Sequence, residues 1–151
     1  MKKYRTFEEI IEDKDFFEEL VNFSRDKLVV EFPLFYKDAQ NYKKITEKDT
    51  RRQAFIKMRD MYASVNSDFR VNCHMDIIKN IQNANENDPS PDVFDEMLSV
   101  VFTMIKTEIL PPFKRSKRYQ NALEKKMKSD KKTGATLFIS TLPLFKKNFT
   151  K

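Results

Sequence analysis

The sequence predicts an all-α fold, and three observations lead to that prediction. The chain has 151 residues, of which 40% are hydrophobic and 14 are phenylalanine, so it can bury one core of ordinary domain size. Gly134 is its only glycine, whereas β-hairpin turns depend on residues with positive φ, a conformation that glycine adopts readily. Apolar residues also recur at intervals of three and four, which is the period of an amphipathic helix.

The first segment, residues 6–23, has this helical spacing, with acidic residues between the apolar ones. Thr6 and Glu9 have the separation of a capping box, in which the two side chains close the start of a helix. The polar stretch that ends at Asp15 predicts a break, with Asp15 as the N-cap of a second helix. Two short helices are therefore expected before Ser24.

Three further helices are expected in the middle of the chain. Pro33 is tolerated in a first helical turn, so a helix is predicted over residues 33–44. Residues 50–65 have the clearest amphipathic pattern, with Thr50 as the N-cap and Val65 on the inward face. A shorter helix is predicted from Asp76, followed by an exposed, asparagine-rich loop over residues 83–89.

A long helix is predicted to begin at Ser90 as N-cap, with Pro91 in its first turn, and to end at Pro111 and Pro112. A helical stretch then continues through Leu123. The apolar tail, residues 136–149, is expected to pack back on the other helices, since it would otherwise expose an unusually large apolar patch.

The composition excludes several classes of active site. A dinucleotide-binding loop, a P-loop and a nucleophile elbow each need at least two glycines, so the chain cannot build any of them. Cys73 is the single cysteine, which rules out an intramolecular disulfide and indicates a reducing, cytoplasmic compartment. His74 is its neighbour in sequence, so the two side chains point to different faces and form no dyad. We expect no catalytic residue, no metal site and no cofactor in this chain.

Basic residues are concentrated between positions 114 and 132, where nine of them stand against Glu124 and Asp130. This local charge of +7 exceeds the +6 of the whole chain, so the remainder is close to neutral. Such a run can be a solvated helix face, a contact for anionic membrane, or a contact for nucleic acid. Nucleic acid is disfavoured because no aromatic residues are interleaved for base stacking. The candidate membrane contacts are Lys114, Arg115, Lys117, Arg118, Lys125, Lys126 and Lys128.

Read in order, the motifs of the chain resemble the regulator of G-protein signalling (RGS) domain. The opening TFEEII of residues 6–11 is similar to the family's first helix, and EFPLFY with YKKI over residues 31–45 is similar to its ENLLFW and YKKI. Val71 and Asn72 stand where the family has its V-N pair. FDE at 94–96 and the closing Phe113, Ser116 and Tyr119 complete the likeness, which spans residues 7–119.

This resemblance implies a fold and a function. The fold would be an RGS-like bundle of about nine helices in a single domain over residues 1–151, with 7–119 as its core. Residues 120–151 would be a C-terminal helical extension packed on that core, a feature more like the RGS-homology domains of Rho guanine-nucleotide exchange factors. The domain would be a cytoplasmic monomer or part of a multidomain protein, and it could be recruited to the inner face of the plasma membrane.

The partner implied by the resemblance is the activated α subunit of a heterotrimeric G protein, Gα. The domain would accelerate GTP hydrolysis by stabilising the Gα switch regions, while Gα itself binds the GTP and Mg²⁺. The alternative is an effector-type domain that binds activated Gα with little or no acceleration. A third alternative is a plain helical scaffold or lipid-binding domain that uses the basic run.

Seven positions correspond to the Gα-facing surface of the family. Glu31 and Asn72 match the family's own residues there. The other five depart from the pattern: Phe32 replaces Asn, Met104 a Leu-like residue, Glu108 Asp, Ile109 Ser and Pro112 Arg. These departures predict a more hydrophobic surface, because Pro112 cannot make the charge-assisted bonds of an arginine. Three interpretations remain open: a Gα with complementary changes, binding by another face, or packing of Phe32 and Ile109 inside the bundle.

Overall fold

The computed structural model describes residues 5–131, and the secondary structure of this part of the chain consists of helices, with no strand. The all-α prediction is therefore confirmed. The elements are α1 (Phe7–Glu12), α2 (Lys14–Asp26), α3 (Glu31–Lys43), α4 (Lys48–Tyr62), α5 (Met75–Gln82), α6 (Asp95–Met104), the π-helical turn η1 (Ile105–Ile109), α7 (Leu110–Lys114) and α8 (Lys117–Lys131). Because α6, η1 and α7 follow one another without a gap, the described residues form seven continuous helices instead of the expected nine or so.

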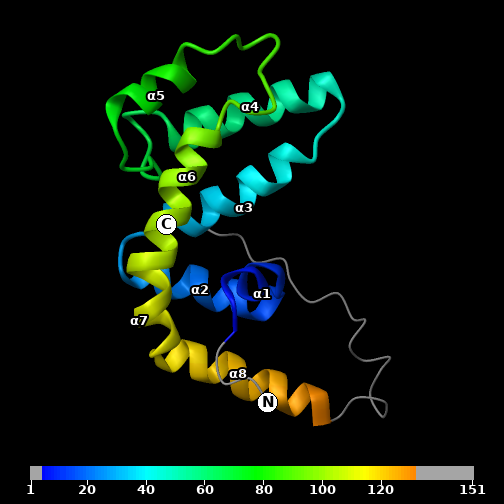
Figure 1. Ribbon diagram of the computed structural model, residues 1–151, viewed down its shortest axis with the longest axis vertical. Helices are drawn as coiled ribbons and strands as arrows, with labels where there is room; N and C mark the ends of the chain where they lie inside the picture. Colours follow the sequence, from blue (N-terminus) through cyan, green and yellow to red (C-terminus); the bar gives the residue numbers. More distant parts are fainter. Residues whose placement is uncertain (1–4, 132–151) are drawn as a thin grey trace.

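The continuous helix from α6 to α7 connects two groups of helices (Figure 1). At one end α3 packs against α4 and α6, and at the other end α2 packs against α1 and α8. Contacts between α2 and α3 join the groups, so residues from the two ends of the described chain share one core. Tyr119 of α8 shows this directly, because its hydroxyl accepts a hydrogen bond from the backbone N–H of Arg5 at 2.9 Å.

Aromatic side chains fill the centre of each group. The ring of Phe94 lies 5.1 Å from that of Tyr42, 5.8 Å from Phe55 and 5.9 Å from Phe35, centroid to centroid. In the other group, the ring of Tyr119 lies 5.4 Å from Phe16. Such tilted and edge-on ring pairs add to the free energy gained by burying the rings, so the phenylalanine-rich composition explains how a chain with one glycine closes its core.

The two N-terminal helices form as predicted, with one change of cap. The Thr6 hydroxyl accepts a hydrogen bond from the Glu9 N–H at 3.2 Å, which confirms Thr6 as an N-cap. The break between the helices is also confirmed, but Asp13 caps α2 and Asp15 does not. One Asp13 carboxylate oxygen accepts from the backbone N–H groups of Asp15 at 3.0 Å and Phe16 at 3.3 Å.

The predicted boundaries of α4 were wrong at both ends. Glu47, not Thr50, is the N-cap, and its carboxylate accepts hydrogen bonds from the backbone of Asp49 and Thr50. The helix ends at Tyr62, so Val65 lies in the following connection, 61% exposed, and not on the inward face. With Glu47 as the cap the helix begins at Lys48, and the carboxylate accepts from the N–H groups of its own first turn, which have no partner inside the helix.

The helix predicted over residues 90–110 differs more. Ser90 accepts a hydrogen bond from the Asp92 N–H at 3.1 Å, but residues 91–94 form a turn and α6 begins at Asp95. Pro111 and Pro112 do not end the helix, since α7 continues through them. In η1 the Leu110 N–H bonds to the Ile105 carbonyl, five residues back. This wider turn accommodates the proline rings, which would clash with carbonyls four residues back in a regular α-helix.

The beginning of the predicted extension is helical. Residues 120–131 belong to α8, which packs against α2 and α7. The apolar tail, residues 136–149, lies outside the described residues, and its packing stays a prediction.

Candidate functional site

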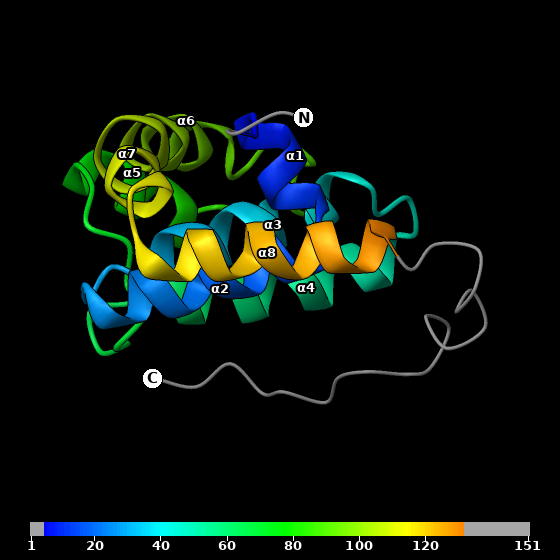
Figure 2. The same cartoon turned by 90° about the horizontal axis from the view of Figure 1, so that it is seen from below.

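Three segments that contain the predicted partner contacts, or end within three residues of them, lie on one side of the described helices. They are the α2–α3 connection over residues 27–30, the α4–α5 connection over residues 63–74, and η1. Both views of the ribbon place them along the left-hand side (Figures 1 and 2). We call this side the connection face. Segments far apart in the sequence are brought together here by the packing of α3 on α6 and of α2 on α3.

Asn72 is one of two exposed polar residues among the predicted contacts, the other being Glu108. The Asn72 side chain makes no hydrogen bond to any part of the chain that the structure describes. Its backbone is nevertheless held, because the preceding Val71 is 1% exposed and donates its N–H to the Tyr62 carbonyl at 2.9 Å. The Asn72 amide can both donate and accept hydrogen bonds, so it is an unused polar group on an anchored backbone.

Further hydrogen bonds fix the α4–α5 connection. The Ser67 hydroxyl donates to the Met61 carbonyl at 2.6 Å and accepts from the Phe69 N–H at 3.1 Å. Gln82 of α5 donates its side-chain N–H to the Ala63 carbonyl at 2.8 Å. A connection held in this way loses little conformational entropy when a partner binds, which favours its use as a binding surface.

Two of the predicted apolar contacts, Phe32 and Ile109, are buried and do not reach the surface. Phe32 is 4% exposed and Ile109 is 3% exposed, and both side chains belong to the core cluster. Of the three interpretations that the sequence left open, this arrangement corresponds to the one in which both residues pack inside the bundle. Glu31 is also largely buried, at 8% exposure, in the first turn of α3, where a carboxylate interacts favourably with the helix dipole.

The remaining predicted contacts lie along η1 and its flanks. Glu108 is exposed, whereas Met104 and Pro112 are half-buried. Met104 and Glu108 line an open hollow of about 370 Å³ together with Ser99, Val100, Thr103 and Thr107. The connection face thus offers a shallow hollow on one helix and an anchored asparagine on the neighbouring connection, which suits a protein partner better than a small molecule.

A comparison with protein-family models finds that residues 6–122 match the regulator of G protein signaling domain. The chain belongs to the RGS family. The match begins one residue before the segment expected from the motifs and ends three residues after it. A comparison with curated proteins finds no match. RGS domains are regulatory domains that bind Gα subunits and are not themselves catalysts, so the chain is a Gα-interacting regulator.

Leu28 is a feature of this RGS domain that the sequence reasoning missed. It is 82% exposed in the α2–α3 connection and has a φ of 62°, in the left-handed region. The Leu28 N–H bonds to the Arg25 carbonyl and the Val29 N–H to the Ser24 carbonyl, a helix end at which glycine is the usual residue. Residues 27–30 include no glycine or asparagine, so the sequence did not show which of them would take that conformation.

The basic run of the RGS domain divides into two sets. Arg118 pairs with Glu19 at 3.2 Å and with Asp26 at 2.9 Å, and Lys126 pairs with Asp13 at 2.8 Å. Two of the seven predicted membrane contacts therefore tie α8 to α2. The other five face solvent to different degrees: Arg115, Lys117, Lys125 and Lys128 are exposed, and Lys114 is half-buried.

Cys73 and His74 have separate structural positions, as their adjacency predicted. Cys73 is half-buried, and this burial raises the pKa of its thiol, so it is uncharged at neutral pH. His74 caps α5, with Nδ1 accepting from the Asp76 N–H at 3.2 Å. Within residues 5–131 no three His, Cys, Asp or Glu side chains are grouped so that they could hold a metal ion. No helix of this part has the length and apolar character to cross a membrane.

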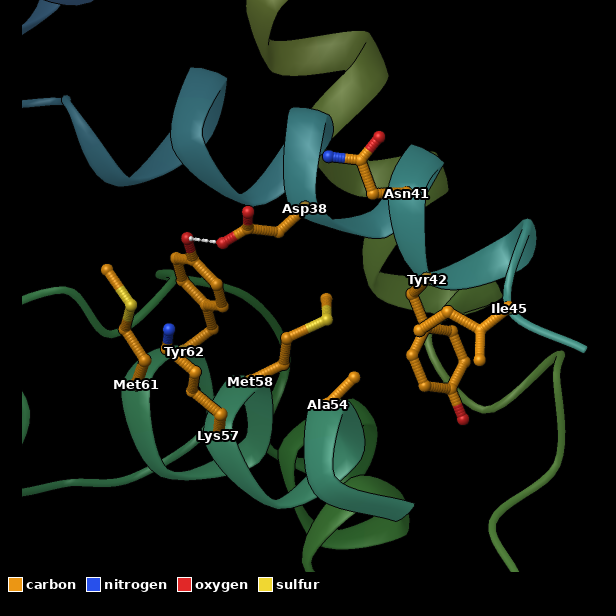
Figure 3. A pocket seen from close by; sticks show the side chains of 9 residues that line it. All are labelled: Asp38, Asn41, Tyr42, Ile45, Ala54, Lys57, Met58, Met61 and Tyr62. Atoms are coloured by element: carbon orange, nitrogen blue, oxygen red, sulfur yellow. Dashed lines mark hydrogen bonds between the residues drawn. The ribbon is translucent and has the colours of Figure 1, made fainter. Parts of the chain in front are cut away.

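A second concavity lies between α3 and α4, away from the predicted contacts (Figure 3). It is a cavity of about 160 Å³ in which the Tyr62 hydroxyl donates a hydrogen bond to the Asp38 carboxylate at 2.6 Å. Burial raises the pKa of Asp38, and the bond from Tyr62 opposes that rise. Met58 and Met61 form apolar walls of the cavity. The cavity is therefore part of the contact between α3 and α4, and the polar pair within it is hydrogen-bonded.

Proposed function

We propose that this RGS domain accelerates GTP hydrolysis by an activated Gα subunit, using the connection face to stabilise the Gα switch regions. The observation that carries the proposal is Asn72: its side chain is exposed and unused, while its backbone is anchored by the buried Val71. Membership of the RGS family supports Gα as the partner. That the domain accelerates GTP hydrolysis by Gα, in addition to binding it, is our proposal.

The proposed mechanism needs no catalytic group from this chain. Gα supplies a glutamine that orients the attacking water and an arginine that stabilises the transition-state charge, and it also binds the GTP and Mg²⁺. A partner can therefore act by holding the switch loops in their transition-state arrangement. The Asn72 amide would bond to a switch loop beside that glutamine, and the anchored connection would keep the amide in position.

The rest of the connection face would supply area and orientation. Glu108 offers an exposed carboxylate, and Glu31 lies at the start of α3 next to the α2–α3 connection. Met104 and Pro112 are half-buried, so they contribute partial apolar area. With Phe32 and Ile109 in the core, the exposed apolar side chains on this face are Leu28, at 82%, and Val65, at 61%. We assign to Leu28, the more exposed of the two, the hydrophobic contact that Phe32 and Ile109 were expected to make.

One observation favours the effector-type alternative. Pro112 has neither a charge nor a hydrogen-bond donor in its side chain, and it stands where the family has an arginine. A charge-assisted bond to Gα is therefore missing from this position, which would reduce the preference for one state of the switch loops. Binding to activated Gα with little acceleration would follow, in a domain that belongs to a larger signalling protein.

A titration separates these functions. The affinity of the domain is measured for one Gα in three forms: with GDP, with a non-hydrolysable GTP analogue, and with GDP plus a transition-state mimic of the γ-phosphate. Tightest binding to the transition-state form supports acceleration, because a catalyst prefers the transition state to the ground state. Equal affinity for the two activated forms supports the effector-type alternative. No binding to any form rejects both.

Asn72 provides the residue-level test. We expect Asn72→Ala to lower the single-turnover hydrolysis rate of the complex more than it lowers the affinity for the GTP-analogue form, because its bond would act mainly in the transition state. Asn80→Ala, which removes an exposed amide from α5, is the matched control and should leave both quantities unchanged. An unchanged rate for Asn72→Ala would reject the assigned role.

A further inference from the structure

Three lysines of α8 remain outside the ion pairs that join this helix to α2. Lys117, Lys125 and Lys128 are exposed, and none of them forms an ion pair within residues 5–131. Their separations of eight and three residues place them on one side of a helix. We call these three the outer lysines. Arg118 and Lys126, which pair with Glu19, Asp26 and Asp13, lie toward α2.

The outer lysines stand on a side of α8 that no other described helix covers. Figure 1 shows α8 along the lower boundary of the described helices, and Figure 2, viewed from below, shows it in front of them. The exposed neighbours on this side include Gln120, Asn121 and one carboxylate, that of Glu124. Three cations against one anion leave this side with net positive charge.

We propose that the outer lysines form a binding surface for anionic phospholipid membranes. Lysine is a compact, strongly hydrated point charge, which suits a diffuse anionic surface better than a single precise phosphate site. A nucleic acid is the less suitable occupant, because the aromatic side chain of this helix, Tyr119, is buried and cannot stack on bases. Met127, 38% exposed on the same helix, offers apolar area close to such a surface.

The location of the outer lysines allows this membrane contact and partner binding at the same time. The connection face lies along the left-hand side in both views (Figures 1 and 2), whereas α8 runs across the lower end in Figure 1 and across the front in Figure 2. The domain could therefore bind a bilayer through α8 and leave the connection face free. The membrane inference does not depend on the proposed Gα function, and it is tested without Gα.

The test measures sedimentation of the full 151-residue chain with vesicles. One vesicle preparation is pure phosphatidylcholine, and the other contains about 30 mol% phosphatidylserine. We expect binding to the anionic vesicles alone. Each basic residue at such a surface changes affinity about fivefold, so the variant with Lys117→Gln, Lys125→Gln and Lys128→Gln should bind about a hundredfold more weakly. Raising the salt concentration should also weaken the binding of the parent chain to the anionic vesicles.

A charge-matched control variant distinguishes binding through the outer lysines from a general effect of the positive charge of the chain. Lys57→Gln, Lys79→Gln and Lys106→Gln together remove the same charge from exposed positions on α4, α5 and η1. We expect the affinity of this control for the anionic vesicles to fall by less than about fivefold. An equal loss in both variants would overturn the proposal, as would unchanged binding of the outer-lysine variant. Tighter binding of the parent chain to a single-stranded oligonucleotide, lost in the same variant, would replace the membrane with nucleic acid. The outer-lysine variant should melt at the parent's temperature, because these lysines make no ion pair with the described residues. The control should melt slightly lower, because Lys57 acts to lower the pKa of the half-buried Asp38 and Lys106 lies 5.4 Å from the centre of the Phe102 ring.

Discussion

Replacing Leu28 by glycine should stabilise the domain. Leu28 has a φ of 62°, and for a residue with a Cβ the left-handed conformation costs about 1–2 kcal/mol. Its side chain is 82% exposed, so little buried apolar area is lost on truncation. Glycine takes this conformation readily but restricts the unfolded chain less, which costs about 0.5–1 kcal/mol. The net expectation for Leu28→Gly is a gain of about 0.5–1 kcal/mol in the free energy of unfolding.

Urea unfolding of the parent and of two variants measures this gain. Leu28→Ala is the control, because it shortens the side chain but keeps the Cβ that causes the strain. Leu28→Gly should have the higher denaturation midpoint at unchanged slope, and Leu28→Ala should stay close to the parent. A Leu28→Gly variant less stable than the parent would refute the reasoning, because the leucine would then contribute packing or the conformation would carry no strain. Equal gains in both variants would refute the assignment to backbone conformation.

The same two variants address the connection face. If Leu28 contacts Gα as proposed, both should bind activated Gα more weakly, even though one of them is more stable. A buried leucine side chain contributes about 1.5–3 kcal/mol, so a loss of affinity of tenfold or more is expected. Met127→Ala, which removes a partly exposed apolar side chain from α8, should bind like the parent. Unchanged affinity of both Leu28 variants for activated Gα would show that Leu28 does not contact Gα.

Two further predictions concern polar pairs. Tyr62→Phe should lower the free energy of unfolding at neutral pH by about 1–2 kcal/mol, because the Asp38 carboxylate loses its hydroxyl donor, whereas Asp38→Asn keeps an acceptor and should cost less. A larger loss for Asp38→Asn in thermal unfolding would contradict this account. Partial burial acts to raise the pKa of Asp13, but the hydrogen bond from Lys126 and the bonds from the backbone lower it below its ordinary value. The pair therefore stabilises the folded protein above the pKa that Asp13 has in the unfolded chain, and this stabilisation is lost as the pH falls through the pKa of Asp13 in the folded protein. Lys126→Met should accordingly reduce the dependence of the free energy of unfolding on pH in the acid range, by at most about 1 kcal/mol. An unchanged pH dependence would show that the pair contributes nothing.

The helices that the sequence predicted best are those whose signals are local. Thr6 and the break before α2 depend on residues within one helical turn, and a polar side chain at that distance can close a helix end whatever lies beyond it. The choice between neighbouring polar side chains was harder, and Asp13 and Glu47 cap their helices where Asp15 and Thr50 were expected. Several residues near a helix start can satisfy the same N–H groups, so the choice depends on where packing stops the helix.

The candidate site was predicted in part. The family pattern directed attention to Asn72 and Glu108, which the structure has at the surface. It left open whether Phe32 and Ile109 would be buried, as they are, because an apolar residue at a helix end can face either the core or a partner. Leu28 escaped attention because its exposure follows from the geometry of a helix end, which hydrophobic periodicity does not describe.

The helical class, the order of the helices and membership of the RGS family follow from composition, periodicity and short motifs, so the sequence is enough to predict them. The packed fold is needed to see that the helix continues past Pro111 and Pro112, and that Arg118 and Lys126 pair with α2 while the outer lysines face solvent. Each of these depends on groups distant in sequence or on a change in helix pitch. The free energies concerned come from packing and charge pairing across helices, which no local pattern records.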